Sequence, residues 1–163
     1  MPIPANVSRD IPILIIDDFT TMRRIVRNSL KQLGFTNIIE ATDGQDALNH
    51  LETSNFECII TEWNMPTING SDLVKIIKAD EKHKKKPLLV ITTESQRSSV
   101  IATEKKGIST YIVKPFSTEI LESKLETLLS SNDWLYFYIN LYPDNEIDTT
   151  NALKQLNHLI HKT

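Results

Sequence analysis

Short runs of hydrophobic residues recur along this chain and alternate with longer stretches of helical periodicity. Five runs rich in Ile and Val, each bounded by turn-forming residues, predict β-strands at residues 11–16, 37–41, 58–61, 88–92 and 110–113. Because these runs are nearly continuous instead of alternating, both faces of the sheet are expected to be covered, which is typical of parallel strands. The pattern therefore predicts an α/β protein with a doubly wound (βα)5 parallel sheet.

The chain is predicted to divide into three parts. Residues 10–130 contain all five strands and their helices, and residues 1–9 are expected to be a flexible N-terminus. Residues 131–163 form a C-terminal extension with an aromatic segment at 134–139 and a final amphipathic helix. Because exposing the aromatic segment would create a large apolar patch, the extension is expected to pack on the first part, on a second copy in a homodimer, or on a partner.

Candidate N-cap residues indicate where three of the helices begin. Thr20 and Ser71 are the expected N-caps of the helices after the first and third strands. Ser117 or Thr118 is the expected N-cap of the helix that ends near residue 130. A side-chain oxygen at each position would accept a hydrogen bond from a backbone N–H of the first helical turn.

Composition and charge exclude several classes of function. With 18 Lys and Arg against 21 Asp and Glu, the formal net charge is −3, so the chain lacks the basic field that is typical of nucleic-acid binding. No stretch approaches the roughly 18 apolar residues that span a bilayer, and no secretory signal is found, so a cytoplasmic location without membrane insertion is expected. The single Cys58 lies in an apolar run and is expected to be a small buried side chain.

Polar residues follow the predicted strands at the positions where a doubly wound sheet binds its ligands. They are Asp17 and Asp18 after the first strand, Glu62 at the end of the third, Thr92 at the end of the fourth and Lys114 after the fifth. Neighbouring carboxylates repel by roughly 4 kcal/mol per pair at about 4 Å and an effective dielectric near 20, so a cation is expected among them. Lys114 and a divalent ion are the candidates, and carboxylate ligands favour Mg2+.

Four short motifs stand at these strand ends and on the helix after the first strand. They are Asp17-Asp18-Phe19, the segment at 22–27, Trp63-Asn64-Met65-Pro66 and Val113-Lys114-Pro115-Phe116. Together they resemble the CheY-like receiver domains of the response regulator family, which act in two-component and chemotaxis signalling. The resemblance covers about residues 10–130 and implies a flavodoxin-like fold.

The resemblance also implies a role for each residue at the strand ends. The implied Mg2+ ligands are Asp17, Asp18, the acceptor position at Glu62 and the backbone carbonyl of Asn64. Thr92 and Lys114 would bind a phosphoryl group, and Tyr111 matches the aromatic residue that turns inward when the threonine moves toward that group. The Lys114–Pro115 peptide bond is expected to be cis.

Glu62 departs from the family pattern, because receiver domains carry the phosphoacceptor Asp at this position. Phosphoryl transfer needs the nucleophilic oxygen at about 3 to 3.5 Å and in line, and a misplacement of about 1 Å can slow it on the order of 100-fold. The additional methylene of Glu62 moves its carboxylate by roughly 1.5 Å. Weak or absent phosphorylation and weakened Mg2+ binding are therefore expected.

Two conformational consequences of Glu62 remain open at the level of sequence. Its carboxylate could reach Thr92 and Lys114 and mimic the active state in part, with Tyr111 buried. It could instead form only an ion pair with Lys114 and leave a rigid scaffold without a switch.

The expected function is signalling through a protein surface, not enzymatic catalysis. That surface would comprise the fourth helix at residues 96–106, the fifth strand with Tyr111, the fifth helix at 117–129 and the extension. Its partner would be a histidine kinase or a flagellar or motility component. The alternatives are an adaptor subunit with a vestigial acidic site and a metal-dependent phosphoryl-transfer enzyme, and the lack of a His, Ser or Cys beside a base disfavours the enzyme.

Overall fold

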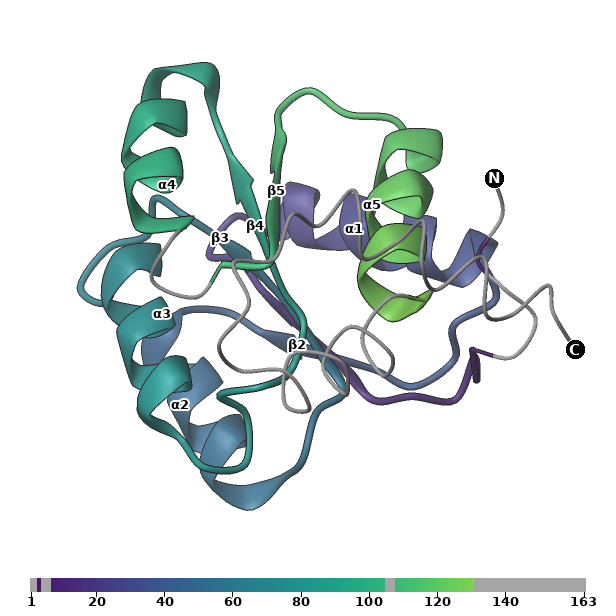
Figure 1. Ribbon diagram of the computed structural model, residues 1–163, viewed down its shortest axis with the longest axis horizontal. Helices are drawn as coiled ribbons and strands as arrows, with labels where there is room; N and C mark the ends of the chain where they lie inside the picture. The colour runs from purple at the N-terminus through teal and green to yellow at the C-terminus, as the bar shows by residue number, and fades with distance from the viewer. Residues whose placement is uncertain (1–2, 4–6, 105–107, 131–163) are drawn as a thin grey trace, which may run out of the picture. The chain divides into compact units, whose positions relative to one another are not determined.

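A five-stranded parallel β-sheet organises the first part of the chain (Figure 1). The computed structural model describes residues 3, 7–104 and 108–130. Its strands are β1 (Ile13–Ile16), β2 (Ile38–Ala41), β3 (Cys58–Glu62), β4 (Leu88–Thr92) and β5 (Thr110–Val113). Their order across the sheet is β2-β1-β3-β4-β5, and every neighbouring pair is parallel. The predicted doubly wound (βα)5 sheet is confirmed.

Helices cover both faces of the sheet. They are α1 (Thr20–Gln32), α2 (Gly44–Thr53), α3 (Gly70–Ala79), α4 (Arg97–Glu104) and α5 (Thr118–Ser130), with a short 3-10 helix η1 (Glu94–Gln96) before α4. In Figure 1, α2, α3 and α4 lie on one face, and α1 and α5 lie on the other. Because successive strand residues point to opposite faces, Leu14 packs in the core on the first face and Ile13 in the core on the second.

Two of the predicted N-caps are wrong and one is confirmed. Phe19 is the N-cap of α1, and Thr20 is already the first helical residue. At α3 the cap is Asn69, whose side chain accepts a hydrogen bond from a backbone N–H of the first turn, so Ser71 lies inside the helix. Asn and Ser are nearly equally favoured as caps, so their tertiary surroundings decide between them. Ser117 does accept a hydrogen bond of 3.3 Å from the first turn of α5.

Cys58 is completely buried, as its place in an apolar run predicts. Burial raises the pKa of its thiol to about 12, so the side chain stays neutral and unreactive at physiological pH. Within the ranges that the structure describes, no helix is both long enough and apolar enough to cross a bilayer.

The chain separates into two compact units, Met1–Leu129 and Ser130–Thr163. The predicted extension at 131–163, with its aromatic segment, final helix and possible homodimer contact, lies outside the described residues. Within the predicted N-terminal segment, Ile3 is buried in the core. Arg9 donates hydrogen bonds to the carbonyls of Ile3, Val7 and Leu33, so these described positions of the segment are anchored.

Candidate functional site

The parallel strands bring four of the predicted site residues to the carboxyl end of the sheet, which is the sheet edge meant below. Glu62 and Thr92 are the last residues of β3 and β4, while Asp17 and Lys114 directly follow β1 and β5. The side chains of Asp17, Glu62 and Thr92 are buried, although all three are polar. Buried polar groups need partners, so the contacts of each decide what the site can do.

Glu62 and Lys114 form a close ion pair at this edge. Lys114 Nζ lies 2.5 Å from Glu62 Oε2, and the backbone N–H of Asn64 donates a hydrogen bond of 3.3 Å to Glu62 Oε1. The approach of Nζ to Oε2 is not aligned as a hydrogen bond, so attraction between the two charges holds it. Only 5% of the Glu62 side chain and 20% of the Lys114 side chain are exposed, so water screens this attraction weakly.

Asp17 adds a second buried carboxylate next to this pair. Its Oδ1 accepts a hydrogen bond of 2.8 Å from the backbone N–H of Phe19. Burial is the main cause that raises the pKa of Asp17, and the charges of Glu62 and Asp18 also raise it. The Phe19 N–H and Lys114 act in the opposite direction without cancelling the rise. A cation bound beside Asp17 would stabilise the charged form that burial disfavours.

Gly70, at the start of α3, closes the loop that carries Trp63 and Asn64. Its backbone N–H donates a hydrogen bond of 2.7 Å to the carbonyl of Trp63. A Cβ atom at Gly70 would lie only 2.7 Å from the Cα atom of Trp63, so any side chain there would push the loop off the sheet edge. No motif in the sequence indicated this role of Gly70.

Thr92 and Tyr111 have partners other than Glu62. The hydroxyl of Thr92 donates a hydrogen bond of 3.3 Å to the carbonyl of Thr93. Tyr111 is half-buried, and its hydroxyl accepts a long hydrogen bond of 3.4 Å from Arg97 Nε on α4. Lys124 Nζ on α5 lies 5.9 Å from the centre of the Tyr111 ring. Arg97 therefore contacts the Tyr111 hydroxyl and Lys124 lies over its ring, and neither was singled out from the sequence.

The fit of this site to Mg2+ is partial. The carboxylates of Asp17 and Asp18 and the backbone at Asn64 offer the oxygen ligands that Mg2+ prefers. Glu62, the third predicted carboxylate, is paired with Lys114 instead. In the part of the chain that the structure describes, no three His, Cys, Asp or Glu side chains are grouped closely enough to hold a metal ion. A bound ion would therefore depend on Asp17, Asp18 and the Asn64 carbonyl.

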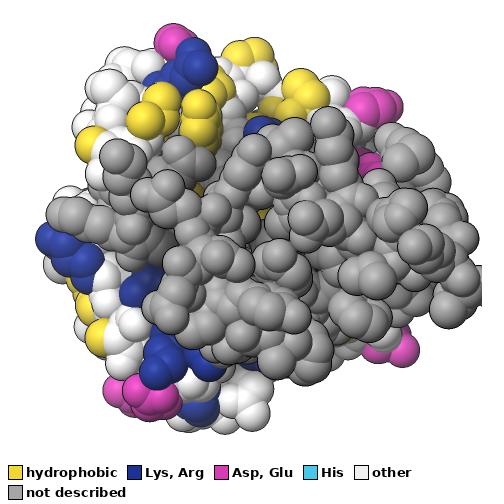
Figure 2. Space-filling view, in the orientation of Figure 1, with side chains coloured by type: hydrophobic (Ala, Val, Ile, Leu, Met, Phe, Trp, Pro, Cys, Tyr) yellow, Lys and Arg dark blue, Asp and Glu magenta, His cyan; other side chains and the backbone are white. Residues whose placement is uncertain are grey.

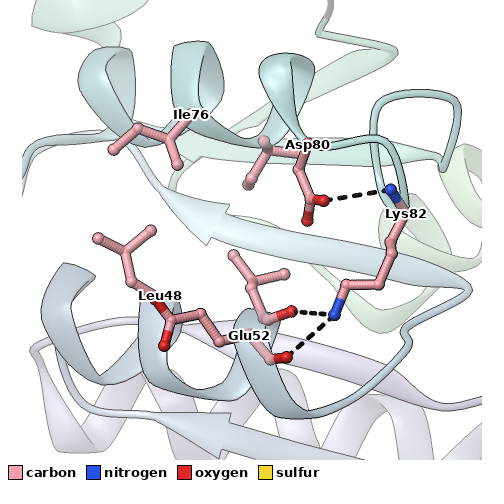
Figure 3. A pocket seen from close by; sticks show the side chains of 7 residues that line it. Leu48, Glu52, Ile76, Asp80 and Lys82 are labelled. Atoms are coloured by element: carbon pink, nitrogen blue, oxygen red, sulfur yellow. Dashed lines mark hydrogen bonds between the residues drawn. The ribbon is translucent and has the colours of Figure 1, made fainter.

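A separate cavity of about 430 Å³ opens between α2 and α3 (Figure 3). Lys82 reaches across it and donates hydrogen bonds of 2.8 and 3.1 Å to the carbonyls of Leu51 and Glu52. These carbonyls belong to the last turn of α2, where they lack partners within the helix, so Lys82 caps that helix. The lining contains none of the predicted site residues; it consists of Leu48, Leu51, Glu52, Ile76, Ile77, Asp80 and Lys82.

Comparison with known proteins agrees with this geometry. Residues 13–126 match the family described as the response regulator receiver domain. The chemotaxis protein CheY of Pseudomonas aeruginosa is 47% identical over 116 residues, which cover 71% of this chain and 94% of that protein. The chemotaxis protein CheY-3 of Vibrio cholerae is 47% identical over 124 residues, covering 76% of this chain and 95% of that protein.

Solved structures show the same fold. Vibrio cholerae CheY4 superposes with a TM-score of 0.68 at 30% identity, over 74% of this chain and 99% of that chain. The receiver domain of a sensor histidine kinase from Pseudomonas aeruginosa has a TM-score of 0.68 at 21% identity, over 75% of this chain and 99% of that chain. That structure was solved with a magnesium ion coordinated in its active site cleft. The family match over residues 13–126 and the convergent strand ends lead to one conclusion: this chain belongs to the response regulator receiver domain family.

Proposed function

We propose that this protein is a CheY-like response regulator of bacterial chemotaxis or two-component signalling that acts by docking to other proteins and is phosphorylated weakly or not at all. The first part is supported by the chemotaxis proteins that are 47% identical to it. The second part depends on one observation, the 2.5 Å ion pair between Glu62 and Lys114 at the phosphoacceptor position.

Two physical causes make Glu62 a poor acceptor. Its carboxylate extends roughly 1.5 Å beyond that of an aspartate, which exceeds the tolerance of in-line transfer. Its Oε2 also faces the Lys114 ammonium, so the attacking oxygen would have to leave a favourable charge contact. Lys114 is then withdrawn from the incoming phosphoryl group that it would otherwise bind.

The same contacts support a resting conformation at the switch residues. Glu62 imitates a phosphoryl group at Lys114, but the hydroxyl of Thr92 is directed to the carbonyl of Thr93. Tyr111 is half-buried and bound through its hydroxyl to Arg97. Glu62 carries one negative charge, whereas a phosphoryl group carries roughly two. Glu62 therefore attracts the Thr92 hydroxyl less strongly than a phosphoryl group would.

Mg2+ would be held by Asp17, Asp18 and the carbonyl of Asn64, with reduced affinity because Glu62 is paired. When bound, the ion would neutralise negative charge on a transferred phosphoryl group. The neighbouring carboxylates of Asp17 and Asp18 are the oxygen ligands that support cation binding at this loop.

The docking surface would comprise α4, β5 and α5, with a histidine kinase or a flagellar or motility component as partner in the cytoplasm. Ile101 on α4 and Ile120 on α5 are 43% and 46% exposed, so both side chains are accessible to a partner. Hydrophobic side chains gather beside basic ones where α4 lies, at the upper left of Figure 2. Residues 131–163 would add to this surface.

The decisive experiment compares the protein with its Glu62→Asp variant. Each is incubated with a small-molecule acyl phosphate and Mg2+, and covalent phosphate is measured by intact mass. We expect little or no adduct on the protein itself and a clear adduct on Glu62→Asp, with Glu62→Gln as the unreactive control. Stoichiometric phosphate on Glu62 would refute the proposal.

The Glu62–Lys114 pair also favours a second function, an adaptor with a vestigial site. The adaptor would bind neither phosphate nor Mg2+, and Glu62→Asp would not restore phosphorylation. The intact-mass comparison therefore separates the two functions.

A further inference from the structure

An arginine of α1 binds the backbone of the acidic loop. Arg23 Nη1 donates a hydrogen bond of 2.9 Å to the carbonyl of Asp17, and Arg23 Nε lies 3.2 Å from Glu40 Oε1 on β2. Arg27 Nη1, one turn further along α1, lies 3.0 Å from the other carboxylate oxygen of Glu40. Only 13% of the Arg23 side chain is exposed, so its burial restricts the guanidinium to few other partners.

These contacts leave Asp17 with little freedom. Its backbone N–H donates to the carbonyl of Ala41, and its Oδ1 accepts from the N–H of Phe19. The Asp17 carbonyl, held by Arg23, lies in the same rigid peptide plane as the backbone nitrogen of Asp18. The orientation of that plane therefore sets the direction in which the chain continues through Asp18.

We propose that Arg23 is a positioning residue for the cation site. It orients the Asp17–Asp18 peptide through the Asp17 carbonyl, so that both carboxylates leave the loop in fixed directions. Glu40 in turn fixes the Arg23 guanidinium from the edge strand β2. The inference rests on the proposed function, which assigns Asp17 and Asp18 to Mg2+.

Arg27 provides a matched control on the same helix. It binds the same carboxylate as Arg23, and its side chain is about one-third exposed. Arg23, by contrast, also binds the Asp17 carbonyl. Replacing Arg27 removes a positive charge and a bond to Glu40, but it leaves the contact between Arg23 and the acidic loop in place.

The test is a Mg2+ titration followed by Trp63 fluorescence, in a Trp134→Phe background that leaves Trp63 as the single indole. We expect Arg23→Met to weaken Mg2+ binding about 10-fold, at the low end of the effect of removing a group that orients a metal ligand. Arg23→Lys keeps one donor and should restore part of the affinity. Arg27→Met should stay within about 2-fold of the parent.

A second readout needs no metal. The Phe19 amide is bonded to Asp17 Oδ1, so its hydrogen exchange reports how firmly the loop is held. We expect faster exchange of this amide in Arg23→Met and unchanged exchange in Arg27→Met, while core amides of β1 exchange alike in both variants. Equal behaviour of the two variants in titration and exchange would overturn the inference. If the parent binds no Mg2+, the metal part of the proposed function fails. The titration is then repeated in Glu62→Asp, and the exchange of the Phe19 amide still decides the role of Arg23.

Discussion

Lys114 is the cation that makes two buried carboxylates tolerable. It lies against Glu62, and it lowers the pKa of Asp17 against the larger effect of burial. Removing two charges from water is costly, and their attraction at close range roughly offsets that cost. The pair therefore contributes little net stability as a unit, whereas the loss of one partner leaves the other as an uncompensated buried charge.

We therefore expect Lys114→Met to lower the free energy of unfolding by about 3 kcal/mol at neutral pH. The double variant Glu62→Gln with Lys114→Met should recover a large part of this loss, because no unpaired charge then remains at the acceptor position. Urea denaturation of the four proteins of this double-mutant cycle gives the coupling energy.

The exposed Lys75 on α3 supplies the control for this cycle. Lys75→Met removes the same charge from a solvated position and should change stability by less than about 0.5 kcal/mol. Additive losses in the cycle would contradict the account of Glu62 and Lys114 as a coupled pair.

The end of α3 is tied to the segment before β3 by one histidine. His83 is fully buried, and its Nε2 accepts a hydrogen bond of 3.1 Å from the backbone N–H of Phe56. Nδ1 must then carry the proton, which it donates to Asp80 Oδ2 at 2.6 Å; this tautomer is assigned from the hydrogen-bond network. The neutral ring thus satisfies two groups that belong to separate loops.

The pH dependence of stability should report this contact. The bond from His83 is the main cause that lowers the pKa of Asp80 below its ordinary value of 3.8, and burial opposes it. A depressed carboxyl pKa stabilises the fold above the unfolded value, and this contribution is lost as pH falls through the folded value. Asp80→Asn should therefore be less stable than the parent at pH 7, and the difference should shrink as the pH falls below about 4.

Urea denaturation at a series of pH values measures this difference. Glu81→Gln is the control, because the Glu81 side chain is 84% exposed and should show no such convergence with the parent. A difference between Asp80→Asn and the parent that stays constant down to the lowest pH would show that the ionised form of Asp80 contributes nothing.

At the scale of the whole molecule, hydrophobic patterning predicted the sheet and the place of the site because both follow from burial. A buried parallel strand needs apolar residues on both faces, and its carboxyl end is where polar residues can begin. The contacts within the site could not be read this way. Arg23 bends back to the Asp17 carbonyl and Gly70 lies against Trp63, and both contacts depend on how separate elements pack.

The hydrophobic cores of the first unit allow a final prediction about residues 131–163. One core is completed from α5 by Leu121, Leu125 and Leu128, and its remaining described members come from the sheet, α1 and the segments that flank them. A chain truncated after Ser130 retains all of these side chains. We therefore expect its free energy of unfolding in urea to stay within about 1 kcal/mol of the full chain.

Leu125→Ala in the truncated chain is the matched control for this measurement. It removes a fully buried side chain of α5 and should lower stability by about 2 to 5 kcal/mol, which shows that the assay detects damage to this core. A comparable loss on truncation alone would mean that the extension completes the core of the receiver unit. A different result would be preserved stability together with weaker capture of a kinase or motility partner by the truncated chain. This result would assign residues 131–163 to docking, because the apolar residues at 134–139 would then be needed for binding and not for folding.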